Sequence, residues 1–146
     1  MNQNEREIIT AVVNEQYFGI LATATEKYPH LSIITYAITK DLQMILFSTP
    51  ADTRKFQNIK KKPEVSFFID NNTNKSENIF NATGIIINGT AEVLDKEGNK
   101  DLLNIYCAKV SELSSFVNDS KNRLIGIRIK KLEIISNFQQ VTAVEL

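Results

Sequence analysis

Residues 43–69 read QMILFSTPADTRKFQNIKKKPEVSFFI, and this order indicates a strand, a loop, a short helix and a second strand. The apolar run at residues 44–47 is short and rich in strand-forming residues. It stops at residues 48–50 (STP), as a buried strand does when it ends in a turn. Pro63 ends the helix, and residues 65–69 place Val, Phe and Ile at alternate positions, which predicts the second strand.

The short helix of this unit predicts an anion site at its first turn. Its N-terminal cap is Asp52 or Thr53, so Arg54 and Lys55 fall where the helix dipole disfavours a cation by ~0.3–1 kcal/mol. A negative ligand offsets that cost. Free backbone amides, the hydroxyls of Thr49 and Thr53 and two cations together describe a phosphate cradle. From the spacing alone, two solvated charges on a surface helix are an equally good interpretation.

Length and composition set the class of protein. The chain has 146 residues, 42% of them hydrophobic, which suits one domain with a proper core, and we expect a single domain over residues 1–146. The formal net charge is zero, so nothing in the overall charge supports binding to nucleic acid or to an anionic membrane. No apolar run approaches the ~20 residues of a membrane span, and the opening MNQNEREII is not signal-like. We therefore expect a cytoplasmic protein.

Hydrophobic periodicity predicts the other elements. Helical spacing marks residues 4–16 and 95–110, and strand patterns mark residues 18–24, 31–39 and 124–135. The first strands and the strand at residue 44 form an antiparallel meander. The polar segment at residues 71–78 (NNTNKSEN) is interpreted as a mobile loop and not as a linker between domains.

Residues 79–94 predict a long strand marked by Gly84 and Gly89, which we interpret as a bulge and a close contact. Its centre, residues 85–87, is three isoleucines, so the strand is apolar on both faces. An antiparallel strand in a small barrel needs only one apolar face. A partner subunit is the simplest cover for the second face.

The inventory of catalytic side chains is small. The chain has one histidine, His30, and one cysteine, Cys107, which excludes an internal disulfide. We interpret Cys107 as a core thiol on a helix and His30 as a structural turn residue, with a role in a pocket as the alternative for His30. No spacing predicts a metal site, a P-loop or a dinucleotide motif. Any chemistry should then come from a bound cofactor.

Three segments resemble, in their order and spacing, the pyridoxamine 5'-phosphate oxidase-like, FMN-binding split-barrel family. They are GILATATEKYPHLSIITYAI at residues 19–38, MILFSTPADTRKFQNIKKKPEVSFFID at residues 44–70 and ATGIIINGTAEVLD at residues 82–95. The resemblance implies a mainly β fold with peripheral helices, in the form of a six-stranded antiparallel split β-barrel.

The resemblance also implies FMN as the cofactor and a homodimer as the assembly. In the family, one motif holds the FMN phosphate, and one strand, with the end of the next, lies against the isoalloxazine ring. The matching residues here are Thr53, Arg54 and Lys55 for the phosphate and Ser32, Ile33, Ile34, Thr35, Ser48 and Thr49 for the ring. The family builds its site at the dimer interface, which would explain the doubly apolar residues 85–87.

The chain departs from the members of the family that oxidise pyridoxamine phosphate. Those members carry further basic residues on the ring-contacting strand and a Trp/Arg segment at the C-terminus. Here Ser32 and Ala37 take the strand positions, and the chain has no tryptophan. We therefore do not expect pyridoxamine phosphate oxidase activity. We interpret residues 137–140 as an edge tail packed on the barrel, with a segment that reaches the pocket as the alternative.

Two functions of different classes follow. The first is an FMN-dependent oxidoreductase that acts on a small, neutral, planar substrate or electron donor, because a charged substrate would bring a phosphate without a partner. The second is a non-catalytic flavin- or haem-binding protein for storage, electron carriage or sensing. The sequence does not separate them, since the cofactor supplies the chemistry in one and is only carried in the other.

Overall fold

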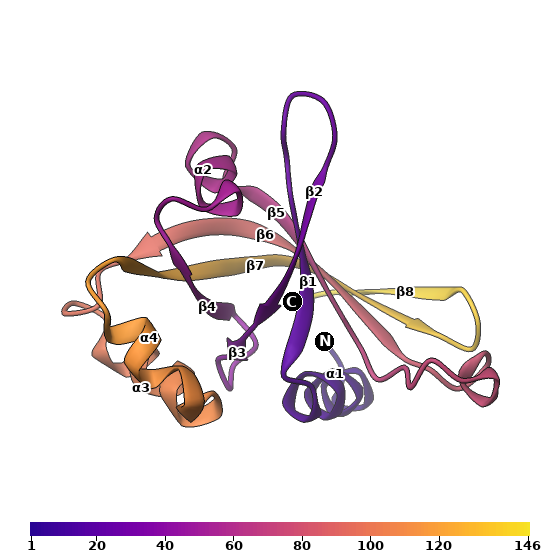
Figure 1. Cartoon of the computed structure of the whole chain (residues 1–146). Helices are drawn as coiled ribbons and strands as arrows, with labels where there is room; N and C mark the ends of the chain where they lie inside the picture. The colour runs from indigo at the N-terminus through magenta and orange to yellow at the C-terminus, as the bar shows by residue number, and fades with distance from the viewer.

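The computed structural model describes all residues from Met1 to Leu146. The strands are β1 (Phe18–Thr23), β2 (His30–Thr35), β3 (Ala37–Ile38), β4 (Met44–Pro50), β5 (Glu64–Asp70), β6 (Gly84–Leu94), β7 (Asn122–Ser136) and β8 (Gln140–Val144) (Figure 1). The helices are α1 (Gln3–Glu15), α2 (Arg54–Lys61), α3 (Lys100–Lys109) and α4 (Ser114–Asn118), with short 3-10 helices η1 (Ser76–Asn78) and η2 (Ser111–Leu113). None of the helices is both long and apolar enough to cross a membrane.

The strands form one antiparallel sheet that closes on itself. Its order is β2-β1-β5-β6-β7-β4-β3, with β8 added to β7 beyond this path. β2 and β3 lie at opposite ends of the order, yet only Tyr36 separates them in the chain. The two ends of the sheet are therefore connected covalently through Tyr36. Strand β2 also contacts β4, although the two strands are not hydrogen-bonded neighbours.

The predicted fold class is confirmed. With β2 and β3 counted as one bent strand, the closed part of the sheet has the six predicted strands. The eighth strand comes from the C-terminus, where residues 137–139 have positive φ and turn the chain back, so that β8 pairs with β7. The segment interpreted as an edge tail is thus the turn of a β-hairpin.

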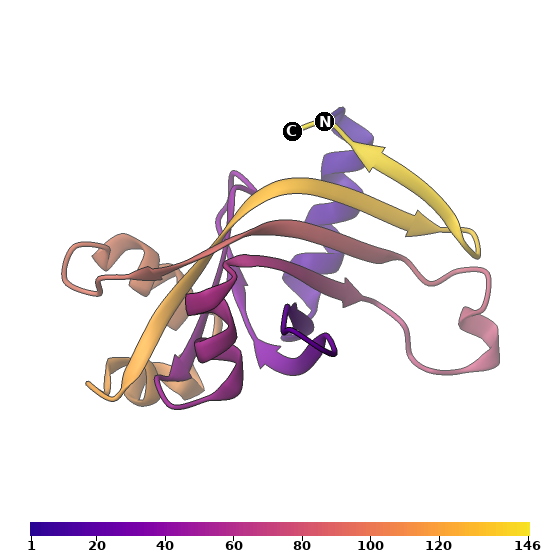
Figure 2. The same ribbon diagram turned by 90° about the horizontal axis from the view of Figure 1, so that it is seen from above.

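The interior of the barrel is closed by α1. Ile9, Val12 and Val13 of α1 are buried and join the cluster of strand side chains that fills the barrel. The helix starts at a capping box in which Asn2 and Glu5 exchange side-chain and backbone hydrogen bonds. In Figure 2 the curved strands β6 and β7 cross over α1, which lies below them in Figure 1.

A second layer covers the other face of β4 and β7. Tyr106 and Val110 at the end of the α3 segment and Val117 of α4 pack on Leu46 and Leu124 of these strands. Figure 1 shows α3 and α4 together on this side of the sheet, away from α1. The thiol of Cys107 packs at the edge of this cluster and is half-buried, so it lies less deep than a core thiol.

Gly89 supplies both the predicted bulge and the predicted close contact. The register of β6 and β7 shifts between Asn88 and Gly89, which leaves Lys130 of β7 without an opposite residue. A Cβ at Gly89 would lie 2.4 Å from the carbonyl oxygen of Arg128, so only glycine fits. The long strand begins at Gly84 and not at residue 79, because residues 79–83 belong to the turn after η1.

The bend at Tyr36 is tied to the end of α1. The Tyr36 side chain is fully buried, and its hydroxyl donates a hydrogen bond of 2.8 Å to the carbonyl oxygen of Val13. The Nζ of Lys109 donates to the same oxygen and to that of Gln16, both over 2.7 Å, and lies 4.2 Å from the centre of the Tyr36 ring. Burial lowers the pKa of Lys109 to about 8. One carbonyl oxygen thus joins α1, the bend and α3.

A double-mutant cycle tests this shared acceptor. Tyr36→Phe and Lys109→Met each leave the Val13 oxygen with one donor, so each should lower the free energy of unfolding by about 0.5–3 kcal/mol. The double variant leaves this buried oxygen without either donor, and its loss should exceed the sum of the single losses by at least ~0.5 kcal/mol. Urea denaturation of the four proteins measures the cycle. Strictly additive losses would show that the two donors act independently.

Candidate functional site

The N-terminus of α2 is organised by two threonines. Thr53 is the cap, and its Oγ1 accepts a hydrogen bond from the backbone N–H of Phe56 over 3.4 Å. The hydroxyls of Thr49 and Thr53 lie 2.9 Å apart, and the Thr53 hydroxyl also donates to the carbonyl oxygen of Pro50 over 3.0 Å. The sequence allowed either Asp52 or Thr53 as the N-cap, and in the structure the N-cap is Thr53. The end of β4 and the start of α2 therefore form one hydroxyl-lined corner.

Two cations stand in the first turn of α2, and they differ in exposure. Arg54 is exposed, whereas Lys55 is half-buried and its burial lowers the pKa of its ammonium group. The ion pairs of the structure join other residues, so no carboxylate compensates Lys55. In contrast, Lys60 and Lys61 are exposed in the last turn, where the helix dipole favours a cation. Lys55 is thus a partly desolvated positive charge at the helix end that attracts anions.

The four residues predicted on β2 divide between its two faces. Ser32 lies opposite Leu21 and Ile34 opposite Gly19, so their side chains face the barrel interior, where Ile34 is buried. Ile33 and Thr35 face outward. A flat ring laid on this strand would therefore meet its backbone and the side chains of one face only.

Ser48 and Thr49 also diverge, as neighbours on a strand must. The Ser48 hydroxyl donates a hydrogen bond of 3.0 Å to the carbonyl oxygen of Arg123 in β7, and Ser48 pairs with Leu124, which is buried under α3 and α4. Thr49 faces α2 and meets Thr53. The structure brings Thr49 and Thr53 to one corner, with Lys55 in the first helical turn that follows, and places Ser48 on the opposite face of β4.

A polar group beneath α2 was not predicted from the sequence. The side-chain amide of Asn58 donates a hydrogen bond of 2.9 Å to the hydroxyl of Thr23 in β1. Thr23 is paired with His30, the first residue of β2, and the Nδ1 atom of His30 is buried without a hydrogen-bond partner. In the sequence, the only signal for this group is that Lys55 and Asn58 are three residues apart and so lie on one side of the helix. The burial of His30 has no such signal, because it depends on where α2 docks.

The outer face of β1 and β2 is an apolar patch that remains open to solvent. Phe18, Ile20, Leu31 and Ile33 are 64%, 41%, 63% and 75% exposed, and they lie next to one another in the β1–β2 register. Half-buried Phe68 and Ile86 continue this outer apolar patch across β5 and β6. Ile85 and Ile87 point into the core instead. A contiguous apolar surface of this kind marks an interaction site.

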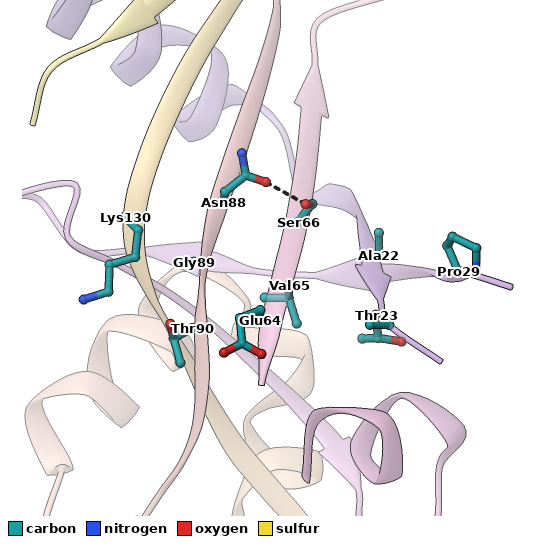
Figure 3. Close-up of a pocket in the computed structure, with 11 residues that line it drawn as sticks. Ala22, Thr23, Pro29, Glu64, Val65, Ser66, Asn88, Gly89, Thr90 and Lys130 are labelled. Carbon is teal, nitrogen blue, oxygen red and sulfur yellow. Dashed lines mark hydrogen bonds between the residues drawn. The ribbon is translucent and has the colours of Figure 1, made fainter. Parts of the chain in front are cut away.

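Two hollows border the patch. One, of about 440 Å³, lies over β1, β5 and β6, where the Ser66 hydroxyl donates a 2.6 Å hydrogen bond to the side-chain oxygen of Asn88 (Figure 3). Pro29 and Lys130 stand on opposite sides of this hollow in Figure 3. The other, of about 410 Å³, is mainly apolar and is lined by Tyr17, Phe18, Thr35, Val110, Glu112 and Leu113. It opens beside the end of β2.

Comparison with known proteins gives a family and a set of similar folds. Residues 6–136 match the family model described as Pyridoxamine 5'-phosphate oxidase. A search among curated proteins found no match.

Three solved structures illustrate the likeness in fold. A haem-binding protein from Mycobacterium smegmatis is 18% identical with a TM-score of 0.80, and the match covers 96% of this chain and 56% of that one. This chain therefore spans about half the length of that protein. An FAD-binding protein from Mesorhizobium loti is 17% identical with a TM-score of 0.73, covering 99% and 96%. A protein from Clostridium acetobutylicum related to general stress protein 26 is 15% identical with a TM-score of 0.76, covering 100% and 97%.

Proposed function

The chain belongs to the pyridoxamine 5'-phosphate oxidase family, and from this premise we propose that it is an FMN-dependent oxidoreductase. We propose further that residues 1–146 act as one FMN-binding domain, that the protein is a cytoplasmic homodimer, and that its substrate is small, neutral and planar. The FAD-binding protein from Mesorhizobium loti supports a flavin in this fold.

The observation that carries the proposal is the corner at the start of α2. Lys55 is half-buried without a carboxylate partner, and the hydroxyls of Thr49 and Thr53 stand beside the free amides of the helix end. An anion is the ligand that such a corner fits, because it offsets both the desolvated ammonium and the positive end of the helix dipole. Arg54, exposed in the same turn, can add a bidentate contact. The donor set therefore suits the phosphate of FMN.

The remaining predicted residues would position the ring. The backbone of residues 32–35 offers hydrogen-bonding groups along one edge of the sheet, and Ile34 beside them is buried. Ser48 would contribute through its backbone, since its hydroxyl is engaged with Arg123. When bound, the flavin would supply the transfer of hydride or electrons, and the protein would anchor and orient it.

The substrate class follows from the lining of the apolar hollow. Tyr17, Phe18, Val110 and Leu113 line it, and Thr35 connects it to the strand proposed to hold the ring. Its volume of about 410 Å³ is within the range for a small-molecule pocket. Glu112 is its only charged residue, so an anionic substrate such as pyridoxamine phosphate would meet repulsion and no cation. A quinone, a nitroaromatic or a second flavin fits this lining.

A second candidate is a non-catalytic protein that carries a flavin or a haem. The haem-binding protein from Mycobacterium smegmatis, which shares the fold, favours this candidate. The visible absorption spectrum of the purified protein distinguishes haem from flavin. Failure of every donor and acceptor to change the oxidation state of a bound flavin would favour the carrier.

The phosphate anchor is tested by replacing Arg54 and Lys55 with Ala together. Since a hydrogen bond to a charged group contributes about 1.5–3 kcal/mol, the double variant should bind FMN at least ~100-fold more weakly. Quenching of flavin fluorescence measures the affinity. Riboflavin, which lacks the phosphate, should bind both proteins equally, and Lys60→Ala and Lys61→Ala serve as controls at the other end of α2. Unchanged FMN affinity in the double variant would refute the anchor.

The homodimer is tested on the outer apolar patch. Ile33→Lys places a charge at its most exposed side chain, so the variant should sediment as a monomer and bind FMN more weakly, because the family builds its site at the dimer interface. Val93→Lys is the matched control, since Val93 is an exposed aliphatic residue on the opposite face of β6. A wild-type monomer that still binds FMN tightly would contradict the shared site.

The substrate class is tested by stopped-flow spectroscopy of the FMN-loaded protein. After anaerobic reduction, neutral quinones and nitroaromatics should reoxidise the flavin with saturable rates, because the apolar hollow admits them. Pyridoxamine phosphate should not reduce the oxidised flavin, because the hollow offers its phosphate no cation. Rapid, saturable reduction by pyridoxamine phosphate, with indifference to the neutral acceptors, would overturn this assignment.

A further inference from the structure

We propose that a small hollow between the end of β5 and the β7–β8 turn binds a primary alkylammonium group. Asp70 would pair with its charge, and the rings of Phe68 and Phe138 would cover its methylene chain. The hollow contains none of the residues assigned above to the flavin or to its substrate, so the inference goes beyond the proposed function. A free aliphatic amine and the side chain of a lysine share this chemistry.

The first observation is the hollow itself. Its volume is about 170 Å³, and its walls come from the ends of β5 and β7, the start of β6 and the turn at residues 137–139. Figure 1 and Figure 2 both show this turn beside the segment that joins β5 to β6. Pockets for whole small molecules measure roughly 300–1,000 Å³, so this hollow suits one group of side-chain size. It adjoins the outer apolar patch at Phe68.

The second observation is an unpaired carboxylate in this hollow. Ile69 of β5 is buried in the core, so Phe68 and Asp70 on either side of it face outward together. Asp70 is half-buried, and burial raises the pKa of its carboxyl, although the backbone N–H of Asn72 offsets part of this effect. The ion pairs of the structure join other residues. A cation in the hollow would compensate this partly desolvated charge.

The third observation is the aromatic wall. The ring of Phe68 lies over Gly84, where an added Cβ would stand 2.8 Å from the Cε2 atom of that ring. Phe138 is 56% exposed, and its ring centre lies 6.0 Å from that of Phe80 in an edge-to-face pair. Residues 137–139 all have positive φ, which is uncommon for residues with side chains, and the turn that they form brings Phe138 to the hollow. Two phenyl rings thus line the space that contains the carboxylate.

The lysines of the protein leave these two rings free. Those that lie over an aromatic ring all use tyrosines or Phe56, and none uses Phe68 or Phe138. An ammonium group is attracted to aromatic rings as well as to a carboxylate, and the methylene chain behind it packs on apolar surface. An external ammonium group can therefore contact both rings and Asp70 at once.

The combination of charge and lining selects an organic cation. An anion would meet the charge of Asp70, and a neutral apolar ligand would desolvate that charge without pairing it. A metal ion is disfavoured as well, because no cluster of three or more potential side-chain ligands occurs in the structure. A primary ammonium has three N–H donors, and Thr83 and Gln139 in the hollow supply oxygen acceptors beside Asp70.

Nuclear magnetic resonance of the wild-type protein tests the site. Titration with n-butylamine, which is charged at neutral pH as lysine is, should shift the backbone amide signals of Phe68, Asp70 and Phe138 saturably. n-Butanol, a neutral counterpart of the same chain length, should bind at least ~10-fold more weakly because it cannot pair with the carboxylate.

Two further probes distinguish the sources of the ammonium group. They are cadaverine, a free diamine, and the peptide acetyl-Gly-Lys-Gly-amide. Tighter binding of cadaverine would support a free amine as the ligand, and tighter binding of the peptide would support a lysine side chain of a protein. Equal binding would support recognition of the ammonium group and its methylene chain alone.

Substitutions supply a second readout. Asp70→Asn keeps the shape of the side chain and removes its charge, so it should weaken butylamine binding at least ~10-fold and leave butanol binding unchanged. Phe138→Leu keeps an apolar side chain and removes the ring, so it should weaken butylamine binding by about 2- to 5-fold. Asp101→Asn, at an exposed position on α3, is the matched control and should bind as the wild type does. The amide spectrum of each variant verifies its fold.

Three outcomes would overturn the ammonium site. They are equal binding of butylamine and butanol, full butylamine affinity in Asp70→Asn, and the absence of a saturable shift in the three amide signals. None of these measurements involves a flavin, so the proposed function stands or fails separately on the affinity for FMN.

Discussion

The backbone connection at Tyr36 constrains the whole molecule, because β2 and β3 sit at opposite ends of the sheet with one residue between them. This connection closes the barrel and forces β2 against β4. The end of β4 leads into α2, and Thr49 and Thr53 form the corner between these two elements. The buried oxygen of Val13, bonded by both Tyr36 and Lys109, holds the bend in place. Barrel closure and the candidate site therefore share strand β4.

The parts of the fold that local signals determine were predictable from the sequence. The unit from β4 to β5 could be predicted, because the helix cap, the apolar stripe and Pro63 lie within a few residues of one another. The break of the predicted strand at Tyr36 was not, because it depends on contacts with α1 and α3 that are distant in sequence. β8 was missed for a similar reason, since it is defined by pairing with β7 and not by its own pattern.

The candidate site shows the same division between local and tertiary information. Helix geometry alone predicted the grouping of Thr53, Arg54 and Lys55. It could not predict that Lys55 is half-buried and Arg54 exposed, because that difference depends on how α2 docks on β1. Alternation along β4 would have separated Ser48 from Thr49 at the sequence level. The buried Nδ1 of His30 had no sequence signal, because a histidine beside a turn is equally compatible with solvent.

Strand β2 contributes to both of the surfaces that the proposed function assigns to a ligand or to a second subunit. On β2, Ser32 faces the interior beside His30, while Leu31 and Ile33 project from the opposite face into the outer apolar patch. In the proposed homodimer, a ligand that orders β2 from inside would also fix the side chains that a second subunit would cover from outside. Binding free energies are reciprocal, so assembly would then strengthen ligand binding by the factor by which the ligand strengthens assembly. In the proposed FMN-binding homodimer, the alternation of side chains along β2 would thus couple cofactor occupancy to dimerisation.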